Sequence, residues 1–295
     1  MNSKLLLQIY KKKHGLVNIY NLLKHTGKLT LPNGYILRFN KGDNKFVKSF
    51  FEFCIFNGIK LLDKPGHWSY KDGIISIPNG IKFLVNNFDS CIIAETFLTD
   101  IHFSAFDLTG KIVVQAGGFI GDTALYYANR GAKIYSFEPD INSFNLGVEN
   151  IKLNPDISQN IVFENAAIGE DGDVLFPNNP NGSGGSSLYT AGNHDKLRIK
   201  SISLSTIFSK YNIISPFLLD LDIKGKEFDV INDENISKFE MVRIEYSTKI
   251  DGMKIGNRDS IIKKLSEYGF KKIRIFKHND EPFDLLDHGT IEAVK

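Results

Sequence analysis

The chain has 295 residues, 42% of them apolar and 24% charged, with 36 Lys and Arg against 34 Asp and Glu. These proportions are typical of a folded globular protein. They exclude a disordered chain, which would be poorer in apolar residues and less balanced in charge. The near-neutral total also argues against a nucleic-acid binder, because it offers no basic excess for phosphates. The length allows one large domain or two smaller ones.

The first 80 residues are expected to form a small mixed region of helices and short strands. Lys, Phe and Asn are frequent there, and turn signals separate short apolar runs. The runs at 35–37 and 73–77 predict strands, and the helical period of 49–62 predicts a helix. We therefore divide the chain into a mixed α+β region at 1–80 and a larger domain at 81–295.

The chain begins with one Lys and a short Leu patch at 5–7, followed by three lysines at 11–13. A secretory signal would place its charge first and continue with a longer apolar run, and no run is long enough to span a membrane. We therefore expect a cytoplasmic protein in which Cys54 and Cys91 are buried free thiols. For residues 1–10, an amphipathic helix docked on the protein is favoured over a helix on a membrane surface.

From about residue 110 onward, segments typical of strands and of helices alternate. Strands are expected at 111–115, 132–137, 161–164, 217–222, 241–246, 271–276 and 290–294. Helices are expected at 122–129, 141–153, 226–231 and 259–268. This order predicts an α/β fold with a mostly parallel, doubly wound sheet whose last two strands pair antiparallel. The run PNNPNGSGG at 177–185 interrupts the order, as a surface loop or a loop facing the substrate.

The strongest functional signal is the run KIVVQAGGFIGDT at 111–123, where a buried strand leads into a glycine turn and a helix. Glycines permit a sharp turn and a close approach to a ligand, and the helix start presents free N–H groups. Glu138, at the end of the next strand, could accept hydrogen bonds from both hydroxyls of a ribose. The pattern predicts a ribonucleoside cofactor site. A purely structural turn stays open, and so does a nicotinamide oxidoreductase, because the run also fits A-x-G-x-x-G.

Several segments, in order, resemble the FkbM-type methyltransferases that depend on S-adenosylmethionine (SAM). They are VVQAGGFIGDT at 113–123, FEP at 137–139, NIKLN at 150–154, NAAIG at 165–169, GSS at 185–187, LLDLDIKGKEFDV at 218–230 and IEY at 244–246. The resemblance covers residues 75–250. It implies a Rossmann-like, seven-stranded class I methyltransferase sheet. It also implies methylation of a hydroxyl on a saccharide, glycolipid or secondary metabolite, with SAM as cofactor.

The resemblance also implies roles for individual residues. The cofactor-binding residues would be Gln115, Gly117, Gly118, Gly121, Asp122, Glu138, Asn165 and Ala166. Glu138 would hold the ribose, and Asn165 and Ala166 would lie near the adenine. Asp222 is the first candidate for the carboxylate that takes the acceptor's proton, and Glu245 is the second. The seven His and two Cys show no spacing typical of a metal site.

Three positions depart from the family pattern. Gln115 stands where the family has Asp, Asp220 where it has Lys, and Lys224 where it has Glu. A compensated exchange of charge would preserve the reaction, whereas a decayed acceptor site would leave a non-catalytic binding protein on the same fold. Asp222 could equally cap a helix or pair with Lys224 or Lys226. The expected partner is a small-molecule or glycan acceptor, and the oligomeric state stays open.

Overall fold

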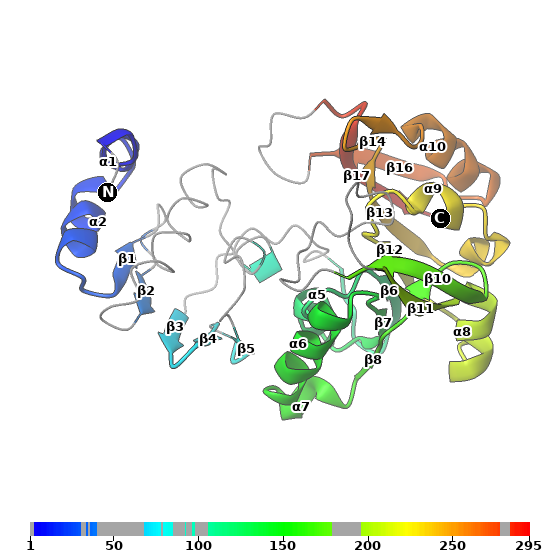
Figure 1. Cartoon of the computed structure of the whole chain (residues 1–295), viewed down its shortest axis with the longest axis horizontal. Helices are drawn as coiled ribbons and strands as arrows, with labels where there is room; N and C mark the ends of the chain where they lie inside the picture. The colour runs from blue at the N-terminus through cyan, green and yellow to red at the C-terminus, as the bar shows by residue number, and fades with distance from the viewer. Residues whose placement is uncertain are drawn as a thin grey trace. The chain divides into compact units, whose positions relative to one another are not determined.

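A seven-stranded sheet organises the second of two units, residues 107–295, in the computed structural model (Figure 1). The first unit is residues 1–106. The structure describes residues 3–30, 34, 36–39, 68–77, 79–84, 92, 96, 97, 106–178, 196–277 and 284–295. The division expected between residues 80 and 81 falls inside the first unit and stays a prediction. The helix expected at 49–62, both cysteines and residues 179–195 lie outside the described residues.

The strands of the large sheet alternate with helices along the chain, as the sequence predicts. They are β6 (Ile112–Ala116), β7 (Lys133–Phe137), β8 (Ile161–Glu164), β12 (Leu218–Leu221), β13 (Met241–Ser247), β16 (Lys272–Phe276) and β17 (His288–Val294). Their order is β16-β17-β13-β12-β6-β7-β8. The five strands from β13 to β8 are parallel, and β17 runs antiparallel to both β13 and β16. The expected α/β fold with an antiparallel end is confirmed.

The described residues of this unit contain seven helical segments. They are α5 (Asp122–Asn129), α6 (Ile141–Lys152), α7 (Pro155–Ser158), α8 (Leu204–Tyr211), α9 (Glu227–Val230), the 3-10 helix η2 (Glu234–Lys238) and α10 (Arg258–Glu267). The sequence analysis missed α8, although Ser203 caps it by accepting a hydrogen bond from the Thr206 N–H. It also missed β9 (Ala167–Ile168) and β11 (Lys196–Ile202), which pair with β10 (Gly172–Pro177) in a small sheet of the order β10-β11-β9. The hairpin of β14 (Lys249–Ile250) with β15 (Met253–Lys254) was missed as well.

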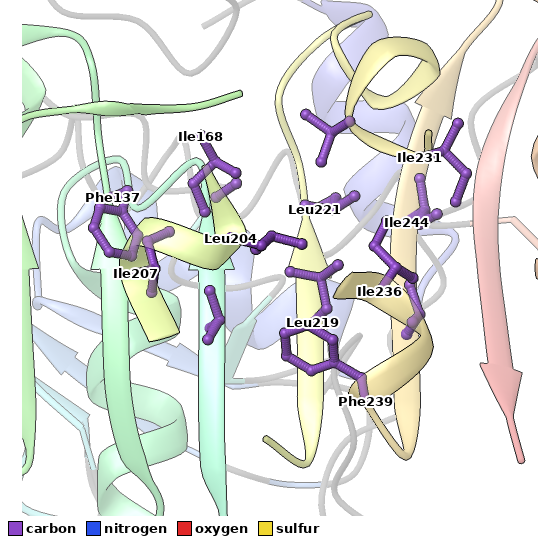
Figure 2. Close-up of a cluster of buried hydrophobic side chains, with 14 of the residues drawn as sticks. Phe137, Ile168, Leu204, Ile207, Leu219, Leu221, Ile231, Ile236, Phe239 and Ile244 are labelled. Atoms are coloured by element: carbon purple, nitrogen blue, oxygen red, sulfur yellow. The ribbon is translucent and has the colours of Figure 1, made fainter. Parts of the chain in front are cut away.

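One face of the large sheet is apolar and carries the main core (Figure 2). Alternate residues of the central strands, such as Val114, Leu219 and Ile244, point to this face because side chains alternate along a strand. Helices α8, η2 and α10 contribute apolar side chains to the same cluster. The opposite face is different, because the remaining alternate positions include polar residues and form the floor of the site described below.

The first unit is a mixed α+β arrangement. It contains α1 (Ser3–Tyr10), α2 (Gly15–Leu23), β1 (Lys28–Thr30), β2 (Ile36–Phe39), β3 (Trp68–Lys71), β4 (Ile74–Ser76) and β5 (Lys82–Leu84). The five strands form one sheet in chain order, in which only β2 and β3 are parallel. Among the described residues of the whole chain, no helix is both long enough and apolar enough to cross a membrane.

Candidate active site

The site lies where the sheet changes direction, between β6 and β12. From β6 the chain builds β7 and β8 on one side, and it returns to place β12 on the other side. The carboxyl ends of β6 and β12 are adjacent, and the Asp222 N–H donates to the Ala116 carbonyl at 3.0 Å. In open α/β sheets a ligand binds in the crevice outside such a switch point. The glycine turn and Asp222 both follow these strand ends.

The glycine turn packs tightly against its neighbouring strands. Gly117 has a φ of +86°, and a Cβ on it would lie 2.0 Å from the Asp222 carbonyl oxygen. A Cβ on Gly118 would lie 2.4 Å from the Ser136 hydroxyl and 2.5 Å from the Phe163 ring. The sequence analysis attributed these glycines to a sharp turn and a nearby ligand. The structure shows the turn. It also shows that neighbouring atoms of the protein leave no room for a side chain at Gly117 or Gly118.

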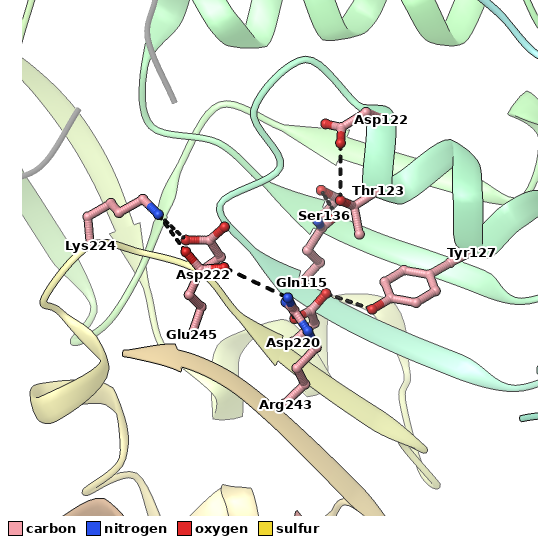
Figure 3. Close-up of polar contacts among 10 residues, drawn as sticks. All are labelled: Gln115, Asp122, Thr123, Tyr127, Ser136, Asp220, Asp222, Lys224, Arg243 and Glu245. Atoms are coloured by element: carbon pink, nitrogen blue, oxygen red, sulfur yellow. Dashed lines mark hydrogen bonds and ion pairs between the residues drawn. The ribbon is translucent and has the colours of Figure 1, made fainter. Parts of the chain in front are cut away.

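Helix α5 begins directly after the turn. Gly121 precedes it with a φ of +78°, and Asp122 is its first residue. The Asp122 side chain is buried, and its carboxylate accepts from the Thr123 hydroxyl at 3.4 Å (Figure 3). The Asn150 amide holds the turn from the other side by donating to the Ile120 carbonyl at 2.9 Å. A carboxylate in the first turn of a helix is favoured by the helix dipole, so the start of α5 is well defined.

Glu138 follows β7 and faces the glycine turn. Its Oε2 accepts from the Phe119 N–H at 2.8 Å, and its Oε1 accepts from the Asp140 N–H at 2.7 Å. Burial raises the pKa of Glu138 to about 8, against the opposing effect of these two hydrogen bonds. A carboxylate offers about four lone-pair positions, so each oxygen keeps capacity for a further donor. The two hydroxyls of a ribose fit this requirement.

Two residues after β8 support the loop that carries Glu138. The Asn165 side-chain amide donates to the Glu138 carbonyl at 2.8 Å and to the Pro139 carbonyl at 3.1 Å. Ala166 is completely buried. The structure thus gives Asn165 a clear part in fixing the loop, while the contacts of Asn165 and Ala166 with an adenine stay predictions.

The two carboxylates expected to act on the acceptor are brought together by Lys224. Its Nζ lies 3.1 Å from Asp222 Oδ1 and 2.9 Å from Glu245 Oε1 (Figure 3). The Asp222 side chain is 38% exposed and that of Glu245 is 7% exposed, so an acceptor can reach Asp222 more easily. Burial and the charge of Glu245 raise the pKa of Asp222, and Lys224 opposes this shift. Burial by itself would lower the pKa of Lys224. The charges of Asp222 and Glu245 outweigh this effect and raise the pKa of Lys224 well above its usual range.

A model of the methyltransferase FkbM domain matches residues 115–272, which are more than half of the chain. The chain belongs to the FkbM methyltransferase family. A comparison of this FkbM protein with curated proteins found no match.

Among solved structures, the FkbM chain is similar to three methyltransferases of low sequence identity. With precorrin-6y C5,15-methyltransferase from Geobacter metallireducens it shares 9% identity at a TM-score of 0.36, covering 63% of this chain and 80% of that one. With Aeropyrum pernix fibrillarin in complex with SAM it shares 16% identity at a TM-score of 0.36, covering 64% of this chain and 69% of that one. With magnesium protoporphyrin IX methyltransferase from Synechocystis PCC 6803 with bound SAM it shares 13% identity at a TM-score of 0.38, covering 64% of this chain and 72% of that one. Because these TM-scores lie below 0.5, we infer neither cofactor nor acceptor from these proteins.

A row of polar side chains crosses the FkbM sheet on the face opposite the apolar core. The strand register sets Ser136, Gln115, Asp220 and Arg243 side by side on β7, β6, β12 and β13. The Ser136 hydroxyl donates to Gln115 Oε1 at 2.8 Å. Arg243 Nη1 donates to Asp220 Oδ1 at 2.8 Å, and the Tyr127 hydroxyl of α5 donates to Asp220 Oδ2 at 2.7 Å (Figure 3). All five side chains are buried.

This row explains two of the departures from the family pattern. Asp220 lies in the interior of the sheet, where Arg243 supplies the charge that balances it. Gln115, its neighbour in register, is neutral and hydrogen-bonded, and its contact with a cofactor stays a prediction. The sequence analysis missed Arg243 and Tyr127. The available signal was the charged residues inside two apolar runs, one in LLDL at 218–221 and two in MVRIEYS at 241–247, because charges in buried strands need partners.

A further carboxylate, Glu227, belongs to the same edge of the FkbM domain. It is 1% exposed, and burial raises its pKa to about 8. The charges of Asp222 and Lys224 act on it in opposite directions, so Glu227 lies within electrostatic reach of both. Its Oε2 finds no hydrogen-bond partner in the described part of the chain. The edge therefore concentrates acidic groups around the switch point.

Proposed function

We propose that the FkbM domain transfers the methyl group of SAM to a hydroxyl oxygen of an acceptor. A saccharide is the first candidate, and a glycolipid or a secondary metabolite is the alternative acceptor. The observation that carries this proposal is the convergence of the glycine turn, Glu138 and Asp222 at the edge where β6 and β12 diverge. This supports the proposal because Glu138, a group suited to a ribose, lies within electrostatic reach of Asp222, a carboxylate suited to accept a proton.

The residues present fit SAM. Glu138 is held by two backbone N–H groups and keeps lone pairs for two hydroxyl donors. Asp222 and Glu245 give the edge a negative character that favours a cation nearby, although Lys224 offsets part of it. When bound, SAM supplies an already activated methyl group. The protein must therefore mainly hold the acceptor oxygen close and in line, which accounts for most of the acceleration in such reactions.

Asp222 is the residue that we assign to the acceptor's proton. The methylated hydroxyl must lose its proton, and a carboxylate within hydrogen-bond reach can take it. The exposed fraction of its side chain makes Asp222 accessible, and its raised pKa makes it a better base than an ordinary Asp. Glu245 is more deeply buried. Its role in this proposal is to hold Lys224, which in turn positions Asp222.

A non-catalytic binding protein is the second candidate, and Lys224 is the observation that favours it. An ammonium paired with both carboxylates competes for the lone pairs that a base must offer. In that case the cofactor would bind, but no acceptor would be methylated.

Calorimetry with SAM, S-adenosylhomocysteine and NAD tests the cofactor first. We expect binding of the first two and none of NAD, and absence of SAM binding would refute the proposal. Transfer of a radiolabelled methyl group to a panel of glycans and other hydroxylated compounds then separates enzyme from binding protein. SAM binding with no labelled product across the panel would favour the second candidate.

Asp222→Asn tests the assignment of the base. It should lower turnover by about 100-fold to 10,000-fold while leaving SAM affinity within a few-fold of the original. Asp229→Asn is the matched control, because Asp229 lies on the same segment with its side chain 57% exposed and paired with Lys226. Undiminished turnover in Asp222→Asn would remove Asp222 from the catalytic role.

A further inference from the structure

The helical hairpin of the first unit exposes an unusual number of apolar side chains. Of α1, Leu7 is 55% exposed and Tyr10 59%. Of α2, Leu16 is 67% exposed, Val17 51%, Tyr20 60% and Leu23 60%. We call these six residues the apolar stripe. On α2 they occupy spacings of one, four and seven residues, which lie on one side of a helix. Exposed apolar side chains gathered on two neighbouring helices commonly mark an interaction site.

Helix α2 buries two polar side chains. Asn18 is 3% exposed and Asn21 8%, and Leu22 is buried beside them. The Asn18 amide donates to the Thr30 carbonyl at 2.7 Å, and its oxygen accepts from the Thr30 N–H at 2.7 Å. These two bonds fix the helix to β1. A surface helix normally buries its apolar side chains, whereas α2 gives two buried positions to Asn and keeps most of its large apolar side chains exposed.

The same segment is strongly basic. Residues 1–42 contain eight Lys or Arg and no Asp or Glu, although the whole chain has a net charge of only +2. The rest of the chain is therefore net negative. The lysines at 11–13, between α1 and α2, are exposed, and so is Lys24 directly after α2. The near-neutral total thus conceals a separation of charge along the sequence, and four of the exposed lysines directly follow the two helices that carry the apolar stripe.

We propose that this surface docks the protein reversibly on an anionic lipid bilayer. Exposed aliphatic side chains would enter the boundary between headgroups and acyl chains, and lysines would contact acidic headgroups. Tyr10 and Tyr20 have the amphipathic rings that are enriched at this depth. With eight and nine residues, α1 and α2 lie on such a surface and do not cross it.

Other partners fit the surface less well. A nucleic acid would use the lysines but leave the aliphatic side chains in water. A second copy packed symmetrically on the stripe would bring two acid-free basic segments together, which repel each other. A bilayer with acidic lipids satisfies both the apolar and the basic features at once.

Co-sedimentation of the full chain with vesicles tests the proposal. We expect binding to vesicles that contain phosphatidylcholine and phosphatidylglycerol, little binding to phosphatidylcholine alone, and weaker binding at high salt. Replacing the lysines at 11–13 with Gln should lower the partition coefficient by about 100-fold, at about fivefold per lysine. Leu16→Gln, Tyr20→Gln and Leu23→Gln together should abolish binding, and because these side chains are exposed the fold should persist.

Matched controls lie in the second unit. The charge control replaces three exposed lysines with Gln at 196, 271 and 272. The apolar control replaces Ile214, Met253 and Leu286, which are 82%, 54% and 59% exposed, with Gln. Both controls should bind vesicles as the original chain does. SAM affinity in solution should be unchanged in all variants, which separates this inference from the proposed function.

Four results would overturn the inference. They are no binding to anionic vesicles, equal binding to neutral ones, equal loss in the matched controls, and dimerisation that the apolar variant abolishes. Binding to DNA that survives the apolar variant while vesicle binding is absent would assign the lysines to a nucleic acid instead.

Discussion

Replacing Arg243 with Met tests whether the exchange of charge inside the sheet is compensated. Met is shorter than Arg but has a similar volume, and it removes the cation that pairs with Asp220 at 2.8 Å. Both side chains are only 2% exposed, so water cannot replace the lost partner. Asp220 would keep the Tyr127 hydroxyl alone. Breaking a buried ion pair by removing one partner costs about 3–5 kcal/mol, and we expect a loss of this size in the free energy of unfolding.

The chain supplies a matched control in Arg198→Met. Arg198 also pairs with an Asp on a neighbouring strand, Asp173, at 3.2 Å, but these side chains are 75% and 51% exposed. Exposed pairs contribute at most about 1 kcal/mol, so this variant should be almost as stable as the original chain. The double variant Asp220→Asn with Arg243→Met should recover more than half of the loss. An Asn carries no charge, and its oxygen still accepts from Tyr127.

Urea unfolding at neutral pH, followed by circular dichroism, measures these differences at constant m-value. Two results would refute the reasoning. One is an Arg243→Met variant that loses no more stability than Arg198→Met. The other is a double variant as unstable as Arg243→Met alone, which would mean that the charge of Asp220 is not what Arg243 balances.

Three further predictions concern the glycine turn and the buried carboxylates. SAM affinity should rise with pH up to about 8 and then level off. The reason is that burial raises the pKa of Glu138 to about 8, and only the ionised carboxylate can accept hydrogen bonds from two hydroxyls. Calorimetry should show that this rise is lost in Glu138→Gln. Burial raises the pKa of Glu227 from 4.5 to about 8. Between pH 4.5 and about 8, the folded chain therefore keeps a proton on Glu227 that the unfolded chain releases. Stability should therefore fall as pH rises through this window, by at most about 1.4 kcal/mol per pH unit for this group, and an unchanged slope in Glu227→Gln would contradict the assignment. Gly117→Ala should destabilise the chain by about 1–3 kcal/mol more than Gly252→Ala. Both glycines have a positive φ, but only at Gly117 would the added Cβ meet a backbone oxygen. Equal unfolding midpoints of the two variants would argue against the tight turn.

The sequence alone determined the chain order of the seven strands of the large sheet, the helices α5, α6, α9 and α10 between them, and the position of the glycine turn. Local signals carry this information, because apolar periodicity distinguishes strand from helix and glycine marks a sharp turn. Glu138 could be placed opposite the turn because it ends the next strand in a predicted parallel sheet. Asp222 could be placed at the switch point for the same reason.

Tertiary structure decided which charges meet. The pairing of Asp220 with Arg243 depends on the register of β12 against β13, and the bridge from Lys224 to Glu245 joins residues 21 positions apart. Register and non-local pairing are set by the packing of the whole sheet, so no local pattern contains them. Helix α2 shows the same limit in another form. The sequence analysis made no prediction for this helix, and the bonds from Asn18 to β1 help to determine which of its side chains lie inward.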